Sequence, residues 1–311
     1  MLKQSYIIEP EKKIPVIEAD VFVAGAGTAG CIAAIAAARQ GAKVVLVEKM
    51  PVPGGTYTNG GIGANSFYAM STDPATAKRT VGGIPYELNQ RLLEAGGGTG
   101  YIPTPEDHHH SPFRFVADHE VYKGVVSEML MEAGVTVYLQ TMFCGVLMEG
   151  DVITAALMEN KDGRSAVAAR QYIDASGDGD IAKFAGAEQV PLWQDYHKVC
   201  GGPTGLVFGM AGVDTERMVA ENPMGAVRLS HAETGVPGVT AEQYAFTHAK
   251  DPERYKAVAD LDMRLFTSMS SIHKGEMTYI NNSKGVACDA SRADALSRAE
   301  RERRINSMRV A

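Results

Sequence analysis

Residues 21–30 have the sequence Val-Phe-Val-Ala-Gly-Ala-Gly-Thr-Ala-Gly, an apolar run that ends in three glycines with the spacing GxGxxG. A run of this kind is typical of a buried parallel strand. The Ala- and Ile-rich stretch 31–39 predicts a helix that Gly41 ends, and 43–48 (Lys-Val-Val-Leu-Val-Glu) predicts a second buried strand. The sequence therefore predicts a β-α-β unit with a glycine-rich loop before its helix.

Each part of this pattern has a physical role in binding a dinucleotide. Gly25 permits the tight turn, Gly27 lets the backbone approach a pyrophosphate, and Gly30 lets the helix pack closely on the strand. The helix N-terminus offers unpaired amides to the anion. Glu48 ends the second strand, where its carboxylate would accept hydrogen bonds from the adenosine ribose hydroxyls.

Two further motifs favour FAD over NAD. Residues 53–56 read Pro-Gly-Gly-Thr, and residues 174–180 read Asp-Ala-Ser-Gly-Asp-Gly-Asp. Together with 25–30 and Glu48, they resemble the motifs of the FAD-dependent oxidoreductase family with a glutathione-reductase-type FAD domain. In that family the glycine pair runs beside the pyrophosphate and flavin, and the A-[ST]-G-D segment returns the chain to the cofactor. The resemblance covers about residues 19–212, and the final helix more loosely.

The β-α-β pattern and the resemblance together predict FAD as the cofactor and a flavin-dependent oxidoreductase as the activity. The resemblance also implies a non-covalent flavin, because Thr56-Tyr57-Thr58 occupies the region where histidyl-linked flavoproteins of the fumarate reductase type carry their attachment histidine. The expected cofactor contacts are Gly25, Gly27, Thr28, Ala29, Gly30, Glu48, Lys49, Gly54, Gly55, Thr56, Phe143, Ala175, Gly177 and Asp178.

The rest of the chain predicts an α/β protein with a Rossmann-like FAD/NAD(P)-binding domain and a second, mixed α+β substrate domain. Residues 51–118 are glycine-rich and irregular apart from a helix at 84–95. The next predicted elements are a helix at 119–133, a strand at 135–139 that extends the parallel sheet, and three meander strands at 143–148, 152–159 and 165–173. A strand at 206–210 and a polar helix at 293–308 follow.

The predicted meander is antiparallel, because good turn chemistry joins its three strands. We expect residues 15–55 and 119–190 to form the FAD-binding domain, and 56–118 and 191–311 to form the substrate or cap domain. The charged run 298–304 is interpreted as the solvated face of the last helix.

Candidate catalytic residues lie between the cofactor motifs. The run 108–110 is His-His-His, and Arg114 and His119 follow it. Imidazole moves protons near neutral pH and Arg clamps carboxylates, so we predict His110, Arg114 and His119 as catalytic residues acting on a small, carboxylate-bearing substrate. The alternatives are a solvated loop and adventitious metal binding.

Composition limits the other classes of function. A net charge of -7 argues against a nucleic-acid groove or an anionic membrane as the main partner. The four cysteines contain no CxxC pair, and the first twenty residues contain no apolar signal segment, so we expect a cytoplasmic protein without a metal site. Cys31 is interpreted as a small buried packing residue.

Members of the resembled family usually continue well past the point where this chain stops, with a segment that covers the flavin. We therefore expect an incomplete substrate domain, completed by a partner chain or in a homo-oligomer. Two alternatives to a flavin oxidoreductase stay open: a thiazole-synthase-like enzyme that binds NAD, and a non-catalytic FAD-binding subunit or half of a split enzyme.

Overall fold

The computed structural model describes residues 11–62, 64–65, 78–103, 113–188, 205–212, 214, 217, 226–233, 240–246, 267–271, 278–282, 288 and 292–310. Its centre is a parallel sheet in the strand order β11-β2-β3-β7, with β2 next to both β3 and β11. The bounds are Val21–Ala24 for β2, Val44–Val47 for β3, Thr136–Tyr138 for β7 and Gln171–Asp174 for β11.

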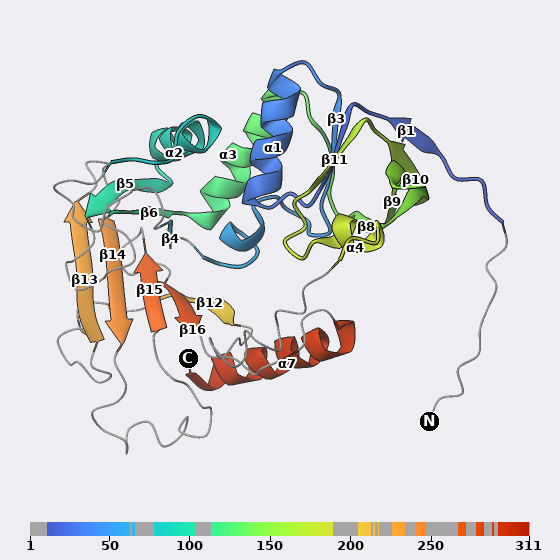
Figure 1. Ribbon diagram of the computed structural model, residues 1–311. Coiled ribbons are helices and arrows are strands. Elements are labelled where there is room, and N and C mark those ends of the chain that lie inside the picture. The colour runs from blue at the N-terminus through green and yellow to red at the C-terminus, as the bar shows by residue number, and fades with distance from the viewer. Residues whose placement is uncertain are drawn as a thin grey trace, which may run out of the picture.

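The parallel sheet lies between a layer of helices and a second sheet (Figure 1). The helices are α1 (Thr28–Arg39), α2 (Ile84–Glu94) and α3 (His119–Glu132). The second sheet has the order β1-β10-β9-β8, from Val16–Glu18, Gly163–Ala168, Val152–Asn160 and Met142–Glu149. The short helix α4 (Asp180–Phe184) follows β11.

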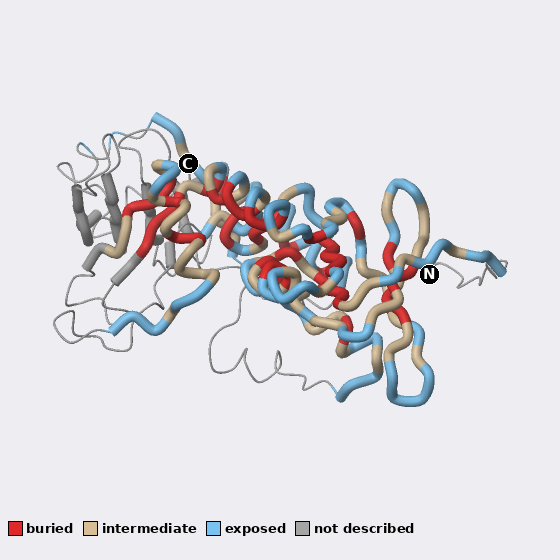
Figure 2. Tube along the Cα trace, turned by 90° about the horizontal axis from the view of Figure 1, so that it is seen from above, coloured by how far each residue is buried: buried red, intermediate tan, exposed pale blue. Residues whose placement is uncertain are grey.

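Alternation along β2 decides which residues face each layer, because successive side chains of a strand point to opposite faces. Val21 and Val23 lie in one buried cluster with Ile35 of α1. Phe22 and Ala24 lie in a second cluster with residues of the meander and Ile181 of α4. Figure 2 shows buried segments running through the middle of the described chain, with exposed segments around them. A strand buried on both faces explains the unbroken apolar run in the sequence.

The predicted strand at 165–173 is two strands, which is a correction to the sequence-based expectation. β10 pairs antiparallel with β9 and belongs to the meander, whereas β11 pairs parallel with β2 and belongs to the central sheet. The amides of Arg170 and Gln171 both donate to the Asp20 carbonyl oxygen, at 3.1 and 3.0 Å, at the point where the chain changes layers. Stacked sheets lie about 10 Å apart, so one continuous strand cannot serve both.

The inserted stretch contains strands as well as the predicted helix α2. These form an antiparallel sheet with the order β4-β6-β5, from Ala64–Asn65, Phe113–Ala117 and Gly98–Pro103. Its register shifts between Gly98 and Tyr101, which interrupts the alternation that would have revealed a strand. The 3-10 turn η1 (Gly55–Tyr57) precedes this sheet.

Side chains of α2 also join the core of the dinucleotide-binding part. Leu88 and Leu92 lie in the same buried cluster as Ile35. The proposed division into two domains stays a prediction, but this packing ties α2 to α1 and α3.

A chain of ion pairs links the three helices at the surface. Glu87 of α2 accepts hydrogen bonds from both terminal guanidinium nitrogens of Arg39 on α1, at 2.6 and 2.9 Å. Arg91 contacts Glu87 at 2.9 Å and Glu132 of α3 at 2.7 Å. Hydrogen bonds from Arg39 are the largest influence on the pKa of Glu87, and they lower it together with Arg91 against a smaller effect of burial.

The later part of the chain forms a five-stranded antiparallel sheet with the order β12-β16-β15-β14-β13, of which only β12 was predicted. The strands are Leu206–Met210, Thr278–Asn282, Thr267–Ser271, Thr240–Phe246 and Ala226–Glu233. β12 contacts the last helix, α7 (Ala293–Val310), and β14 contacts β5. Among the helices of the described residues, none is both long and apolar enough to span a lipid bilayer.

The predicted last helix is confirmed, but the interpretation of 298–304 as a fully solvated face is wrong at one position. Arg303 is buried, on the stripe that also buries Ala295, Ala299 and Ser307 at intervals of one helical turn. The other arginines of this stretch are exposed.

Candidate functional site

The glycine-rich loop connects β2 to α1, as predicted. Gly25 has φ +95°, a backbone conformation that side chains disfavour, and a β-carbon there would collide with the carbonyl of Ala175. A β-carbon on Gly30 would collide with the carbonyl of Gly25. Close backbone packing within the protein therefore explains the first and third glycines.

Gly27 has no such explanation. A β-carbon on Gly27 would meet no atom nearer than the Cα of Gly55, at 4.0 Å, and its φ of -68° suits any residue. Gly27 is also the N-cap of α1, with no side-chain cap and no acidic residue in the first turn, which includes Thr28 and Ala29. No carboxylate of the first turn thus competes for the helix amides beside Gly27, which fits a bound phosphate.

The glycine pair at 54–55 packs directly on this loop. The Gly54 amide donates to the Ala26 carbonyl oxygen at 2.7 Å, and Gly54 forms a parallel β-bridge with Gly27. Gly54 and Gly55 both have positive φ. Two motifs that are distant in the sequence therefore form one backbone cradle at the N-terminus of α1, and Thr56 follows it in η1.

Glu48 is 6% exposed and its two oxygens accept different backbone amides. Oε2 accepts from the Ala26 amide at 2.7 Å, and Oε1 accepts from the Met50 amide at 2.8 Å. Sequence reasoning missed both contacts. A carboxylate oxygen has two lone pairs, so each oxygen keeps acceptor capacity for a ribose hydroxyl.

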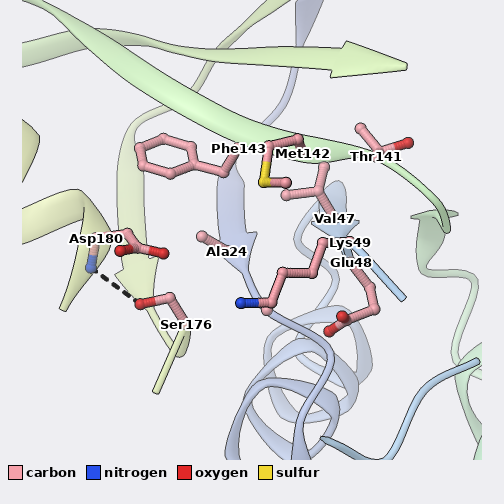
Figure 3. Close-up of a pocket in the computed structure, with 10 residues that line it drawn as sticks. Ala24, Val47, Glu48, Lys49, Thr141, Met142, Phe143, Ser176 and Asp180 are labelled. Atoms are coloured by element: carbon pink, nitrogen blue, oxygen red, sulfur yellow. Dashed lines mark hydrogen bonds between the residues drawn. The ribbon is translucent and has the colours of Figure 1, made fainter. Parts of the chain in front are cut away.

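A pocket opens beside Glu48, between the ends of β2 and β3 and the start of β8 (Figure 3). Four of the predicted cofactor contacts line it; of the other six, Ser176 and Asp180 belong to the predicted 174–180 motif, and sequence reasoning missed the remaining four. The predicted ones are Gly25, Glu48, Lys49 and Phe143; the others are Ala24, Val47, Thr141, Met142, Ser176 and Asp180. The Phe143 ring packs edge-on against Phe184, with ring centroids 5.7 Å apart.

The 174–180 turn forms one wall of this pocket. Asp174 accepts hydrogen bonds from the Ser176 hydroxyl at 2.7 Å and from the Ala182 amide at 3.1 Å. Burial raises the pKa of Asp174, but these hydrogen bonds outweigh it and leave the pKa below its ordinary value. The Ser176 hydroxyl also accepts from the Asp180 amide at 3.0 Å, as Figure 3 shows. The turn is thus held by its own side chains.

Charges of both signs meet at this wall. Burial raises the pKa of Asp180, the neighbouring Asp178 raises it further, and Lys49 opposes these effects. In Figure 3 the Lys49 amine points toward the side formed by Ser176 and Asp180.

Two predicted cofactor residues of the turn occupy different surroundings. Ala175 packs on the phosphate loop, with its amide donating to the Ala24 carbonyl oxygen at 2.9 Å. Gly177 has φ +84°, and a β-carbon there would meet nothing within 4 Å.

The three predicted catalytic residues are described to different extents. His110 lies outside the described residues, and so does the side chain of Arg114, whose backbone belongs to β6. His119 is the first residue of α3, is buried, and contacts the Tyr57 ring edge-on at 6.3 Å. Burial lowers the pKa of His119 to about 4, so its imidazole is neutral at pH 7. Tyr57 in turn stacks on Tyr122, with centroids 4.4 Å apart.

A β-α-β unit with a glycine loop, an acidic residue at the end of β3 and an antiparallel meander over the sheet defines the class of Rossmann-like dinucleotide-binding proteins. Within that class, the chain belongs to the family described as FAD dependent oxidoreductase, whose model matches residues 20–311. The resemblance predicted from the sequence is confirmed. FAD, the cofactor predicted from the sequence, is the one that the family description names.

Two curated relatives match parts of the chain. One is a fumarate reductase (cytochrome) from Shewanella frigidimarina, 48% identical over 60 residues, which are 19% of this chain and 10% of the relative. The other is a digeranylgeranylglycerophospholipid reductase from Methanosarcina acetivorans, 24% identical over 180 residues, which are 54% of this chain and 40% of the relative. This chain thus matches well under half the length of either relative.

Among solved structures, a geranylgeranyl bacteriochlorophyll reductase-like protein from Thermoplasma acidophilum is 17% identical with a TM-score of 0.46. That similarity covers 86% of this chain and 56% of the solved one.

Proposed function

We propose that FAD binds with its pyrophosphate over Gly27 and its adenosine in the pocket beside Glu48, and that the enzyme transfers a hydride between a small organic substrate and the flavin. The observation that supports this placement most directly is the glycine at position 27. Neither its backbone angles nor its protein neighbours require a glycine there. A ligand that approaches the backbone closely does require one.

Three features of the cradle suit a pyrophosphate. The amides at the start of α1 carry the positive end of the helix dipole. The first turn contains no acidic residue, so no side chain of that turn competes for these amides. The Gly54–Gly55 backbone adds a second wall, and it can lie against Gly27 because Gly55 has no β-carbon.

The pocket suits the adenosine end of the cofactor. Glu48 keeps lone pairs for ribose hydroxyls, because each oxygen accepts only one backbone amide. Met142 and Phe143 present apolar surface for the adenine ring on the opposite side of the pocket. Lys49 also lines this pocket and supplies a positive charge for an anionic cofactor.

The chemistry of the proposed reaction is supplied by the flavin, which accepts or donates a hydride when it is bound. The protein holds the cofactor and substrate at reacting distance and excludes water. We propose that His110 and Arg114 bind a carboxylate of the substrate. Their support is position: β6, which carries Arg114, leads through Asp118 into α3, and Tyr57 of the glycine-pair turn contacts the start of α3.

The test of this function is the absorbance spectrum of the purified chain, followed by extraction and mass determination of its ligand. The expected result is a flavin spectrum and the mass of FAD, released by denaturation alone because the flavin is non-covalent. Anaerobic addition of a reductant should bleach the spectrum. A colourless protein that releases an NAD-derived ligand would instead support the thiazole-synthase-like alternative. A yellow protein that is active only when a second polypeptide is added would support the non-catalytic subunit or half of a split enzyme.

A further inference from the structure

The carbonyl oxygen of Ala26 lies in the middle of the phosphate loop and accepts two hydrogen bonds. The Gly54 amide donates at 2.7 Å, and the Cys31 thiol donates at 3.2 Å. The Gly54 amide also contacts the Cys31 sulfur. The three groups thus form a compact triangle that joins the phosphate loop, the first turn of α1 and the glycine pair.

Cys31 acts in this triangle as a protonated donor. Its side chain is 1% exposed, and burial raises the pKa of the thiol to about 12, with the hydrogen bond from Gly54 opposing and the charge of Glu48 adding to the effect. A thiol with such a pKa stays protonated at every physiological pH, so it is neither a nucleophile nor a redox centre. Its proton is available for the Ala26 carbonyl.

The Ala26 residue is consequently held on both sides. Its N–H donates to Glu48 and its C=O accepts from Cys31 and Gly54. These contacts set the two peptide planes that immediately precede Gly27. A loop that is ordered before the ligand arrives loses less conformational entropy on binding, and this raises the affinity.

We propose that Cys31 is a positioning residue for the cofactor: its thiol holds the phosphate loop in the conformation that binds the FAD pyrophosphate. This inference rests on the proposed placement of the pyrophosphate over Gly27. It adds a role to the interpretation of Cys31 as a small buried packing residue, because the buried thiol also donates to the loop carbonyl.

The test compares Cys31→Ala, which removes the donor, with Cys31→Ser, which keeps one. Ile35→Val is the matched control, because Ile35 is buried one turn further along α1 and belongs to the core without contacting the loop carbonyl. For each folded apoprotein, calorimetric titration with FAD and with ADP gives the dissociation constant. Thermal unfolding without ligand gives the stability.

Loss of one hydrogen bond should weaken both FAD and ADP binding by about threefold to tenfold in Cys31→Ala. Cys31→Ser should restore the affinity to within about twofold of the wild type, because the hydroxyl donates to the same carbonyl. Ile35→Val should lower the unfolding temperature while leaving both dissociation constants unchanged. This pattern separates positioning from packing.

The inference would be overturned if Cys31→Ala bound FAD and ADP with the same dissociation constants as the wild type. It would also be overturned if Ile35→Val lost as much affinity as Cys31→Ala. Failure of the cofactor placement itself is a separate outcome. It would be seen as normal FAD binding by Gly27→Val, whatever Cys31 does.

Discussion

The backbones of Gly27 and Gly55 lie so close together that a β-carbon on Gly55 would be 2.7 Å from the Cα of Gly27, whereas a β-carbon on Gly27 would meet nothing nearer than 4.0 Å. The two glycines therefore have different reasons to be glycine. Gly55 is required by the protein's own packing, and Gly27 by the proposed ligand.

Substitution at these two glycines should consequently separate folding from cofactor binding. Gly27→Ala should fold with the stability of the wild-type apoprotein but bind FAD at least about tenfold more weakly, and Gly27→Val should abolish binding, because the added carbons occupy the phosphate position. Gly55→Ala should lower the unfolding temperature even without FAD. Calorimetric titration and thermal unfolding of the three apoproteins give both quantities. Wild-type FAD affinity in folded Gly27→Val would overturn the placement.

Glu48→Gln should impair FAD binding almost as much as Glu48→Ala. Both carboxylate oxygens accept backbone amides, so a glutamine would direct its own N–H₂ at either the Ala26 or the Met50 amide. Hydrogen bonds to a charged group are worth on the order of 1.5 to 3 kcal/mol each, which predicts a loss of FAD affinity of about tenfold or more. A Gln variant with the wild-type dissociation constant would show that one neutral acceptor suffices.

His119 makes the stability of the protein depend on pH. Its pKa is about 4 in the folded protein, because burial disfavours the charged ring, against an ordinary value of 6.5. Between these two values the unfolded chain binds the proton more readily, so the contribution is complete above about pH 6.5 and is lost as the pH falls toward 4. The full loss is up to about 3 kcal/mol.

The measurement for His119 is the free energy of unfolding in urea from pH 7.5 to 4.5, for the wild type and for His119→Leu. Other titrating groups contribute equally to both proteins, so the difference between the two curves isolates His119. The wild type should lose stability more steeply below pH 6.5. Parallel curves would mean that the pKa of His119 is the same in the folded and the unfolded protein.

The ion pairs centred on Glu87 should stabilise the contact of α2 with α1 and α3. Their side chains are about one-third exposed, so Glu87→Gln should cost only about 1 kcal/mol at low salt and much less in 1 M salt, where the charges are screened. Glu120→Gln is the control, because Glu120 is 77% exposed and its ion pair among the described residues is with Lys123 on the same helix. Urea unfolding at both salt concentrations checks this. If the two variants lost the same free energy of unfolding, the Glu87 ion pairs would not stabilise the contact between the helices.

Arg114→Ala and His110→Ala should alter flavin reduction by substrate without changing the FAD content. The expected reason is loss of the proposed carboxylate contact, and the measurement is stopped-flow bleaching of the flavin with a panel of small carboxylic acids. His108→Ala is a matched control from the same histidine run. Wild-type bleaching rates in both variants would contradict this proposal and support the alternative that these residues lie in a solvated loop.

Much of the dinucleotide-binding part could be predicted from the sequence, because its signals are local. The apolar runs of β2 and β3, the glycines between β2 and α1, and the turns of the meander each determine a short stretch of backbone by themselves. For the same reason helices α2, α3 and α7 end within a few residues of their predicted ends.

The elements that sequence reasoning missed depend on partners that are far away along the chain. β11 separates from β10 only because the edge of β2 is free to accept it. The sheet formed by β5 and β6 contains glycines and a register shift, which hide its alternation. A strand of this kind is stabilised by cross-strand pairs, and these do not exist until the chain has folded.

The site divides in the same way. The sequence alone determined that a phosphate loop, an acidic residue and a glycine pair are present, because each requires a particular residue type at a particular spacing. Only the tertiary structure decided that Gly54 lies on Gly27, that Glu48 accepts the Ala26 amide and that Cys31 donates to the Ala26 carbonyl. The hydrogen bonds that hold Ala26, from Gly54, from Cys31 and to Glu48, are 2.7 to 3.2 Å long, and the first of them joins residues 28 positions apart. Geometry of that kind arises only from packing the helix and both sheets together, and no local pattern encodes it.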